Sequence, residues 1–127
     1  MLWDSNIIIY SSLPEHAFLQ QLSKGQKVYA SAISHLEVLG YHQLAEGDQA
    51  YFERFFLAAT TTSITPTIIN LAVALRQQKK MSLGDAIIAA TALEHELILL
   101  SRNTADFQHI EDLDGTPLEL VDPFEGK

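Results

Sequence analysis

The sequence predicts an α/β protein with a mostly parallel central sheet that is covered by helices on both faces. One observation predicts this class, and a second predicts the number of domains. Short β-branched or apolar runs alternate along the chain with longer segments of helical periodicity, which is typical of a parallel sheet between layers of helices. No repeat, low-complexity tract or linker interrupts this pattern over 127 residues, a length that suits one core. We therefore expect a single domain over residues 1–127.

The expected strands are short and apolar or β-branched: residues 1–3, 28–30, 60–65, 97–100 and 118–121. The expected helices carry apolar residues at spacings of three and four: residues 14–25, 34–47, 48–56, 65–80 and 82–96. Residues 4–9 fit a turn and the start of a helix, although so short a segment has no decisive periodicity.

Several helix ends carry recognisable residues. Thr65 followed by Pro66 is a standard helix opening, because the threonine can cap the first turn and proline suits its first position. Ser34 is expected to begin the second helix and Gly47 to end it. Asp48 is a plausible cap for the aromatic segment that follows.

Composition limits the classes of protein that fit. The chain has no cysteine, which excludes disulfides, thiolate metal sites and cysteine nucleophiles. No apolar run approaches the roughly 20 residues needed to span a bilayer, and Asp4 stands where a signal peptide would be basic. We therefore expect a cytoplasmic protein. The net charge of -8 opposes nucleic-acid binding by bulk electrostatics, unless carboxylates gather around divalent cations that reverse the local field.

Acidic residues follow three of the expected strands. Asp4 comes after the first strand, Glu37 shortly after the second, and Asp106 after residues 97–100. In parallel α/β sheets the ligand crevice lies beyond the carboxyl ends of the strands. The fold is therefore expected to bring these acids together.

Each acid also has a structural interpretation. Asp4 fits a turn residue, and Asp85 and Asp106 fit helix caps. Glu37 fits a capping box with Ser34, in which the two side chains satisfy each other's backbone amides. Taken one at a time, the acids do not decide between structure and chemistry.

The surroundings of Asp85 favour chemistry. Residues 83–90 place this carboxylate at the start of an otherwise apolar helix, where an unpaired charge is costly unless something positive compensates it. Several carboxylates in one crevice repel one another, which favours raised pKa values or bound divalent cations. Oxygen ligands without cysteine indicate magnesium or manganese.

Two C-terminal stretches, residues 85–92 and residues 99–107, resemble the signature of PIN domains, particularly the VapC toxins of toxin–antitoxin pairs. Asp4-Ser5-Asn6 and residues 34–37 resemble the family's other two motifs, in the same order and at similar spacing. The resemblance implies a PIN-like three-layer α/β/α sandwich and an endoribonuclease that uses Mg²⁺ or Mn²⁺. It also implies an RNA substrate, a cognate antitoxin protein and a homodimer.

The resemblance assigns roles position by position. The catalytic acids are Asp4, Glu37, Asp85 and Asp106, and the metal ligands among them are Asp4, Asp85 and Asp106. Asn103 matches a family position that is acidic in some members, and Ser5 matches a hydroxyl beside the first aspartate, so both are secondary site candidates. Ser101 stands where threonine is commoner.

Basic and aromatic residues offer further candidates. Lys79, Lys80 and Arg102 flank the expected site and could grip RNA phosphates; alternatively the lysines complement a helix dipole and Arg102 pairs with an acid. The five histidines show no paired spacing, so a catalytic histidine is not expected. One aromatic group is expected to pack in the core or, if exposed, to accept an antitoxin helix: Tyr51, Phe52, Phe55 and Phe56.

Other functions stay open at this point. A PIN-like module that binds RNA or regulates without cleaving would keep the fold, and a housekeeping nuclease would keep the chemistry without an antitoxin. A different magnesium-dependent phosphoryl-transfer enzyme or a DNA nuclease is more distant, and no phosphate-binding GxxxxGK loop is present.

Overall fold

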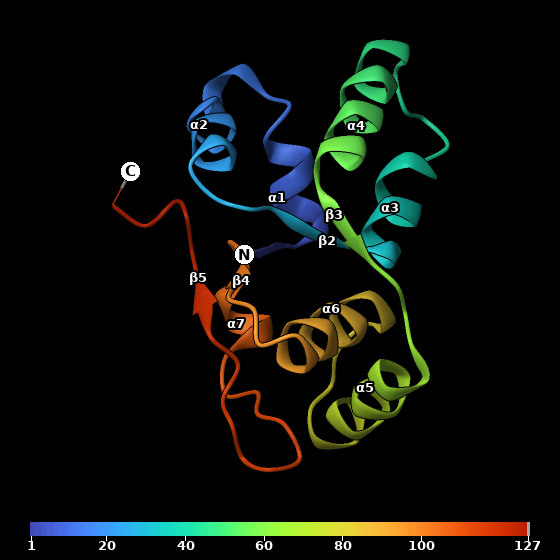
Figure 1. Ribbon diagram of the computed structural model, residues 1–127, viewed down its shortest axis with the longest axis vertical. Coiled ribbons are helices and arrows are strands. Elements are labelled where there is room, and N and C mark those ends of the chain that lie inside the picture. Colours follow the sequence, from blue (N-terminus) through green and yellow to red (C-terminus); the bar gives the residue numbers. More distant parts are fainter. Residues whose placement is uncertain (127) are drawn as a thin grey trace.

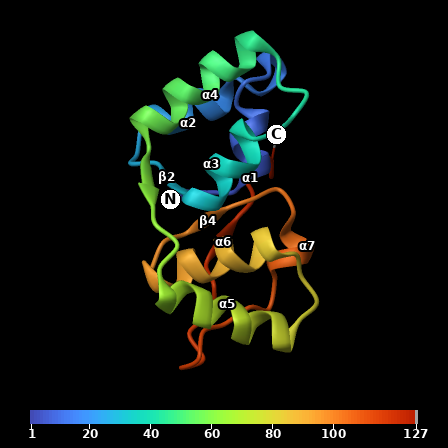
Figure 2. The same cartoon turned by 90° about the vertical axis from the view of Figure 1, so that its right-hand side faces the viewer.

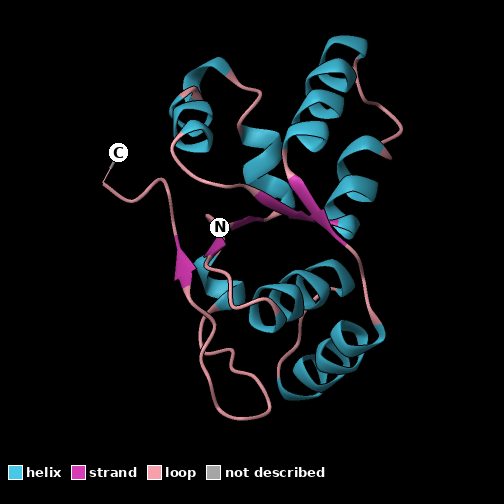
Figure 3. Cartoon of the chain, in the orientation of Figure 1, coloured by secondary structure: helices cyan, strands magenta, loops and turns pink. Residues whose placement is uncertain are grey.

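The computed structural model describes residues 1–126. Five short strands form one sheet in the order β3-β2-β1-β4-β5, and every pair of neighbouring strands is parallel. Figure 3 shows the strands between the helices. The strands are β1 (Leu2–Trp3), β2 (Tyr29–Ser31), β3 (Thr60–Thr62), β4 (Leu99–Leu100) and β5 (Leu120–Val121).

Helices cover both faces of this sheet. The first four lie on one face and the last three on the other, as the two orthogonal views show (Figures 1 and 2). They are α1 (Ser5–Tyr10), α2 (Phe18–Lys24), α3 (Ala32–Leu39), α4 (Glu46–Ala58), α5 (Pro66–Gln78), α6 (Leu83–Glu94) and α7 (Thr104–Phe107), with a 3₁₀ turn η1 (Pro14–His16) before α2. The predicted α/β class with helices on both faces is confirmed.

The adjacent strands β1 and β4 contribute side chains to both hydrophobic cores, one on each face of the sheet. Side chains alternate across a strand, so Leu2 and Leu99 join the core under α5–α7, while Trp3 and Leu100 join the core under α1–α4. All four are buried. Two residues per strand are enough to tie the layers together because each points to a different core.

The aromatic segment of α4 packs into the second of these cores. Phe52 and Phe56 are buried, and Tyr51 and Phe55 pack partly buried against the same cluster. The packing interpretation of this group is confirmed.

None of the described helices is both long and apolar enough to cross a membrane.

Two predicted helix boundaries are wrong. The second helix begins at Ala32, because Ser31 at the end of β2 caps it by accepting a hydrogen bond from the Ile33 amide at 3.2 Å. It ends at Leu39, and Gly47 lies inside the next helix.

That next helix, α4, begins two residues before Asp48, which therefore lies in its first turn and does not cap it. An acid in the first turn is favourable because the amides there are free. The opening at Thr65 is confirmed, since its hydroxyl accepts from the Ile68 amide at 3.2 Å.

Candidate active site

The carboxyl ends of β1, β2 and β4 lie at one edge of the sheet, and each of these strands ends at a polar residue or is directly followed by one. Asp4 follows β1, Ser31 ends β2 and Ser101 follows β4. The Asp4 amide donates to the carbonyl of Leu100 at 3.2 Å, which fixes the exit of β1 beside the exit of β4. Residues that are far apart in the sequence therefore lie close together at this edge of the sheet.

Asp4 is the most buried acid of this region, with 4% of its surface exposed. It caps α1 by accepting a hydrogen bond from the Ile7 amide at 2.9 Å. Burial raises the pKa of Asp4 above its ordinary value of 3.8, and the charges of Asp85 and Glu37 add to this effect, while hydrogen bonds from Ser101 and Ile7 oppose it. The predicted turn residue is thus a helix cap, placed within the electrostatic reach of two other acids.

Asp85 lies in the first turn of α6, half-buried. The alternative interpretation of Asp85 as a helix cap is wrong: Ser82 is the cap, and its hydroxyl accepts a hydrogen bond from the Asp85 amide at 3.1 Å. Burial raises the pKa of Asp85, opposed by the Ser82 hydroxyl and reinforced by the charges of Asp106 and Glu37. The carboxylate is therefore free of a capping role.

Glu37 projects from the middle of α3, and its side chain is exposed. Its Oε1 accepts a hydrogen bond from the Ser5 hydroxyl at 2.8 Å, and Ser5 Oγ also lies 2.9 Å from Ser34 Oγ. The alternative interpretation of Ser34 and Glu37 as a capping box is wrong, because Ser34 lies inside the helix with its buried hydroxyl beside Ser5. Glu37 is held by a side chain of α1 and not by its own helix end.

Asp106 lies in the one-turn helix α7 and is exposed. The alternative interpretation of Asp106 as a helix cap is wrong, because Asn103 is the N-cap and Asp106 lies inside α7. The Asp106 carboxylate accepts a short hydrogen bond from the side-chain amide of Asn103. The Asn103 backbone amide in turn donates to Ser101 Oγ at 3.1 Å. Ser101 therefore links Asp4 to the loop that carries Asn103 and Asp106.

The four predicted acids are thus electrostatically coupled. Asp85 is central, because its pKa responds to Glu37 and Asp106 and its own charge raises that of Asp4. Among the described residues, no three acids or histidines stand close enough together to enclose an ion as they are. The donor set still fits a hard divalent cation, because it consists of carboxylate, amide and hydroxyl oxygens.

The three predicted phosphate-binding residues occupy different surroundings. Lys79 donates to the carbonyls of Ala105 and Gln108. Arg102 lies over the ring of Phe124, with its guanidinium carbon 4.2 Å from the ring centroid. Lys80 is exposed.

Among the histidines, His35 stacks on Phe56 at 4.8 Å between ring centroids. That contact places its ring beside an aromatic residue of α4.

Two residues near the acids are not among the site residues that the sequence predicts. Gly84 stands against the Glu37 carboxylate, and Ser101 hydrogen-bonds Asp4. A glycine directly before Asp85 at a helix start is the available signal for the first. A serine at the end of a buried strand is the signal for the second.

The fold and this acidic site have the characteristics of one family of proteins. A profile of the PIN domain matches residues 1–113, and the chain belongs to the PIN domain family.

Solved structures give the same result over nearly the full length. A toxin–antitoxin complex from Klebsiella pneumoniae contains a chain with 32% sequence identity and a TM-score of 0.76, with 98% of each chain covered. VapBC2 from Rickettsia felis bound to a DNA fragment from its promoter gives 19% identity and a TM-score of 0.74, with 95% of this chain and 98% of that one covered. VapBC-1 from nontypeable Haemophilus influenzae gives 22% identity and a TM-score of 0.72, covering 95% and 96%. A comparison with curated proteins gives no significant match.

Proposed function

We propose that this protein is a metal-dependent endoribonuclease and the toxin of a VapBC-type toxin–antitoxin pair. The observation that carries the proposal is the coupling of Asp85 to Asp4, Glu37 and Asp106 at the carboxyl edge of the sheet. The pKa values of Asp4 and Asp85 are raised by burial and by neighbouring carboxylates, and perturbed acids of this kind in a cluster are typical of functional sites. Membership of the PIN domain family supports nuclease chemistry at this edge.

The partners of these carboxylates favour a divalent cation. Asp4, Glu37 and Asp106 accept hydrogen bonds from neutral groups, namely Ile7, Ser5 and Asn103. Neutral donors orient a carboxylate without cancelling its charge, so like-charge repulsion remains. Mg²⁺ or Mn²⁺ would compensate that charge with the oxygen ligands that both ions prefer.

Each side chain has a distinct role in this proposal. Asp4, Asp85 and Asp106 would hold the ion. When bound, the ion would supply a water activated for attack on the phosphorus and would stabilise the leaving oxygen. Asp4 is fixed by the α1 amide and by Ser101, so its carboxylate keeps one orientation.

Glu37 and Asn103 are exposed polar residues of the proposed site. Glu37 is exposed, and Ser5 occupies only its Oε1, so its carboxylate can still accept a hydrogen bond from a water or a ribose hydroxyl. Asn103 holds Asp106 through its side-chain amide. In line with the family resemblance, the products would carry a 5′-phosphate and a free 3′-hydroxyl.

A protein partner follows from the relatives. The chain that covers 98% of this sequence at 32% identity comes from a toxin–antitoxin complex, which supports a cognate antitoxin here. A homodimer is part of the same proposal. Apolar side chains of α5 and α6 that remain exposed are compatible with it: Ile69, Val73 and Leu83. The expected place of action is the cytoplasm, where RNA and antitoxin are both present.

Incubation of the purified protein with total RNA tests the nuclease proposal. Wild-type protein is expected to cleave with Mg²⁺ or Mn²⁺ and to stop when a chelator is added. Asp85→Asn is expected to be inactive, whereas Asp48→Asn, in the first turn of α4, serves as the matched control and keeps full activity. Cleavage in the chelator, or full activity of Asp85→Asn, contradicts the proposal.

The antitoxin proposal has a separate test. Expression of the wild-type gene alone is expected to stop growth, and co-expression of a small DNA-binding protein encoded beside it is expected to restore growth. Active cleavage without growth arrest would identify a housekeeping nuclease. Binding of RNA without cleavage would identify a non-cleaving module.

A further inference from the structure

Lys79 is bound to the backbone on both sides of Asp106. Its ammonium donates to the carbonyl of Ala105 at 3.2 Å and to that of Gln108 at 3.0 Å. Lys79 is half-buried, whereas its neighbour Lys80 is exposed. Two of the three ammonium protons are thus engaged by backbone oxygens of the segment that carries a proposed metal ligand.

The helix that Lys79 contacts has little stability of its own. α7 is a single turn, and its N-cap residue Asn103 makes no side-chain capping bond. The chain leaves it through Gln108 in an extended conformation and His109 at a φ of 65°, in the left-handed region. A one-turn helix gains few backbone bonds, and its last carbonyls need partners from elsewhere. A cation at this end supplies partners and favours the helix dipole.

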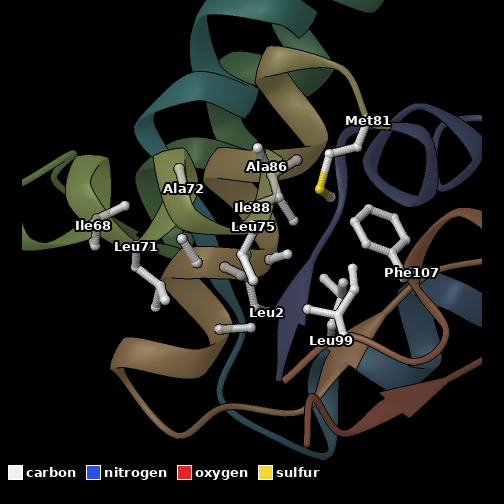
Figure 4. Packing of buried hydrophobic residues seen from close by; sticks show 14 residues of the cluster. Leu2, Ile68, Leu71, Ala72, Leu75, Met81, Ala86, Ile88, Leu99 and Phe107 are labelled. Atoms are coloured by element: carbon white, nitrogen blue, oxygen red, sulfur yellow. The ribbon is translucent and has the colours of Figure 1, made fainter. Parts of the chain in front are cut away.

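The segment that presents Lys79 is itself fixed to the core. Arg76 Nε donates to the carbonyl of Met81 at 3.1 Å, which ties the end of α5 to the connection before α6. Met81 and Phe107 both belong to the buried cluster under α5–α7, and Figure 4 shows their side chains next to each other. Lys79 therefore joins the packed layer of α5 and α6 to the small helix that carries Asp106.

We infer that Lys79 is a positioning residue: by capping α7 from α5, its ammonium holds Asp106 within the acidic site instead of gripping an RNA phosphate. The inference rests on the proposed function, because it assigns Lys79 to the metal site. The inference gives different roles to two adjacent lysines that have the same predicted role in the sequence. Lys79 acts on a carboxylate ligand through the protein backbone, whereas the side chain of Lys80 is exposed to solvent.

Hydrogen exchange and Mn²⁺ titration of Lys79→Met test this inference, with Lys80→Met as the matched control. In Lys79→Met we expect exchange of the Gln108 amide, which bonds to Thr104 O at 2.9 Å, to accelerate at least about tenfold, because both charge-assisted hydrogen bonds of Lys79 are lost. We expect Mn²⁺ affinity to fall by about 10- to 100-fold, as for residues that orient metal ligands. Lys80→Met should change neither, and Lys79→Arg should retain most of both.

Three results would overturn the inference. The first is unchanged exchange at Gln108 in Lys79→Met. The second is faster exchange with unchanged Mn²⁺ affinity, which would leave Lys79 a merely structural role. The third is an equal decrease of about one in the salt dependence of RNA affinity for both lysine variants, which would make both of them phosphate contacts. Exchange and Mn²⁺ binding do not need cleavage, so a failure of the nuclease proposal would be recognised separately by an inactive wild-type protein.

Discussion

Gly84 leaves the space that the Glu37 carboxylate occupies. A Cβ atom on Gly84 would lie 2.9 Å from Glu37 Oε2 and 3.2 Å from Oε1, closer than nonbonded atoms normally approach. Gly84 belongs to the first turn of α6, directly before Asp85, where free backbone amides favour a negative group. The missing side chain thus lets the carboxylate of α3 rest against the start of α6.

Replacing Gly84 by alanine is expected to displace Glu37 and keep the fold. The atoms in the way are the far end of a flexible side chain, which can swing aside. Alanine also favours helix by up to about 1 kcal/mol over glycine, so the melting temperature should be unchanged or higher. RNA cleavage should fall by about tenfold, the effect of about 1.4 kcal/mol lost in the transition state.

Gly47→Ala is the matched control, because Gly47 also lies in a helix and a Cβ there meets no atom within 4 Å. It should raise the melting temperature without changing cleavage. In a Glu37→Ala background, Gly84→Ala should cost no further activity. Full activity of Gly84→Ala in the wild-type background would show that the carboxylate need not rest there.

The stability of the metal-free protein should decrease as the pH rises above about 4. Burial raises the pKa values of Asp4 and Asp85 above 3.8 in the folded state. Between 3.8 and the raised values the unfolded chain has already lost these protons and the folded chain still holds them, so increasing pH favours unfolding. Asp4→Asn removes one such group and should flatten the profile.

Thermal unfolding in chelator from about pH 4 to about pH 8 measures this effect as the difference between wild type and Asp4→Asn. The variant should be relatively more stable at neutral pH, because it buries no carboxylate charge. A difference that does not vary with pH would mean that Asp4 ionises as easily in the folded protein as in the unfolded chain.

Adding Mn²⁺ should reverse that loss of stability. A cation that binds only the folded state stabilises it by about 2.7 kcal/mol at a hundredfold excess over its dissociation constant. Because protons compete for Asp4 and Asp85, whose pKa values are raised, the stabilisation should weaken as the pH falls. Calorimetric unfolding with Mn²⁺ and then with excess chelator measures it, and Asp4→Asn should show little of it. A Mn²⁺ effect of equal size in wild type and Asp4→Asn would place the ion elsewhere.

Arg102 should contribute to stability through Phe124 and not to RNA binding. Its guanidinium lies 4.2 Å from the Phe124 ring centroid and 5.7 Å from that of Tyr10. Such a contact is worth about 0.5–1 kcal/mol at an exposed position. A double-mutant cycle of Arg102→Gln and Phe124→Leu in urea should give a coupling energy of that size. If Arg102→Gln instead weakens RNA binding and the coupling energy is zero, Arg102 is a substrate-binding residue.

Local signals explain how much of the fold was predictable. The sequence predicts the helices that open at Thr65 and Ser82 to within a residue or two, because a capping side chain and an apolar period coincide there. The start of α3 differs from the prediction because Ser31 and Ser34 are both residues that can cap a helix, and only the pairing of β2 makes Ser31 the last residue of a strand.

The order of the strands predicts the region of the candidate site but not the contacts within it. Acids that follow parallel strands meet at one edge, and this rule gave the region of Asp4, Glu37 and Asp106 from the sequence. The contacts that orient them are tertiary: Gly84 against Glu37, and Lys79 across α7. No spacing in the chain encodes such contacts.

The most direct test of the account is the rate of RNA cleavage as a function of Mg²⁺ concentration, measured for wild type and Asp4→Asn. Wild type is predicted to show no cleavage without the ion and a saturating increase with it. Asp4→Asn is predicted to be at least about a hundredfold slower at every concentration while it unfolds cooperatively, since residues that only orient metal ligands already cost up to about that much. Cleavage by wild type that does not depend on Mg²⁺, or a coincident curve for Asp4→Asn, would contradict a metal-dependent ribonuclease built on these acids.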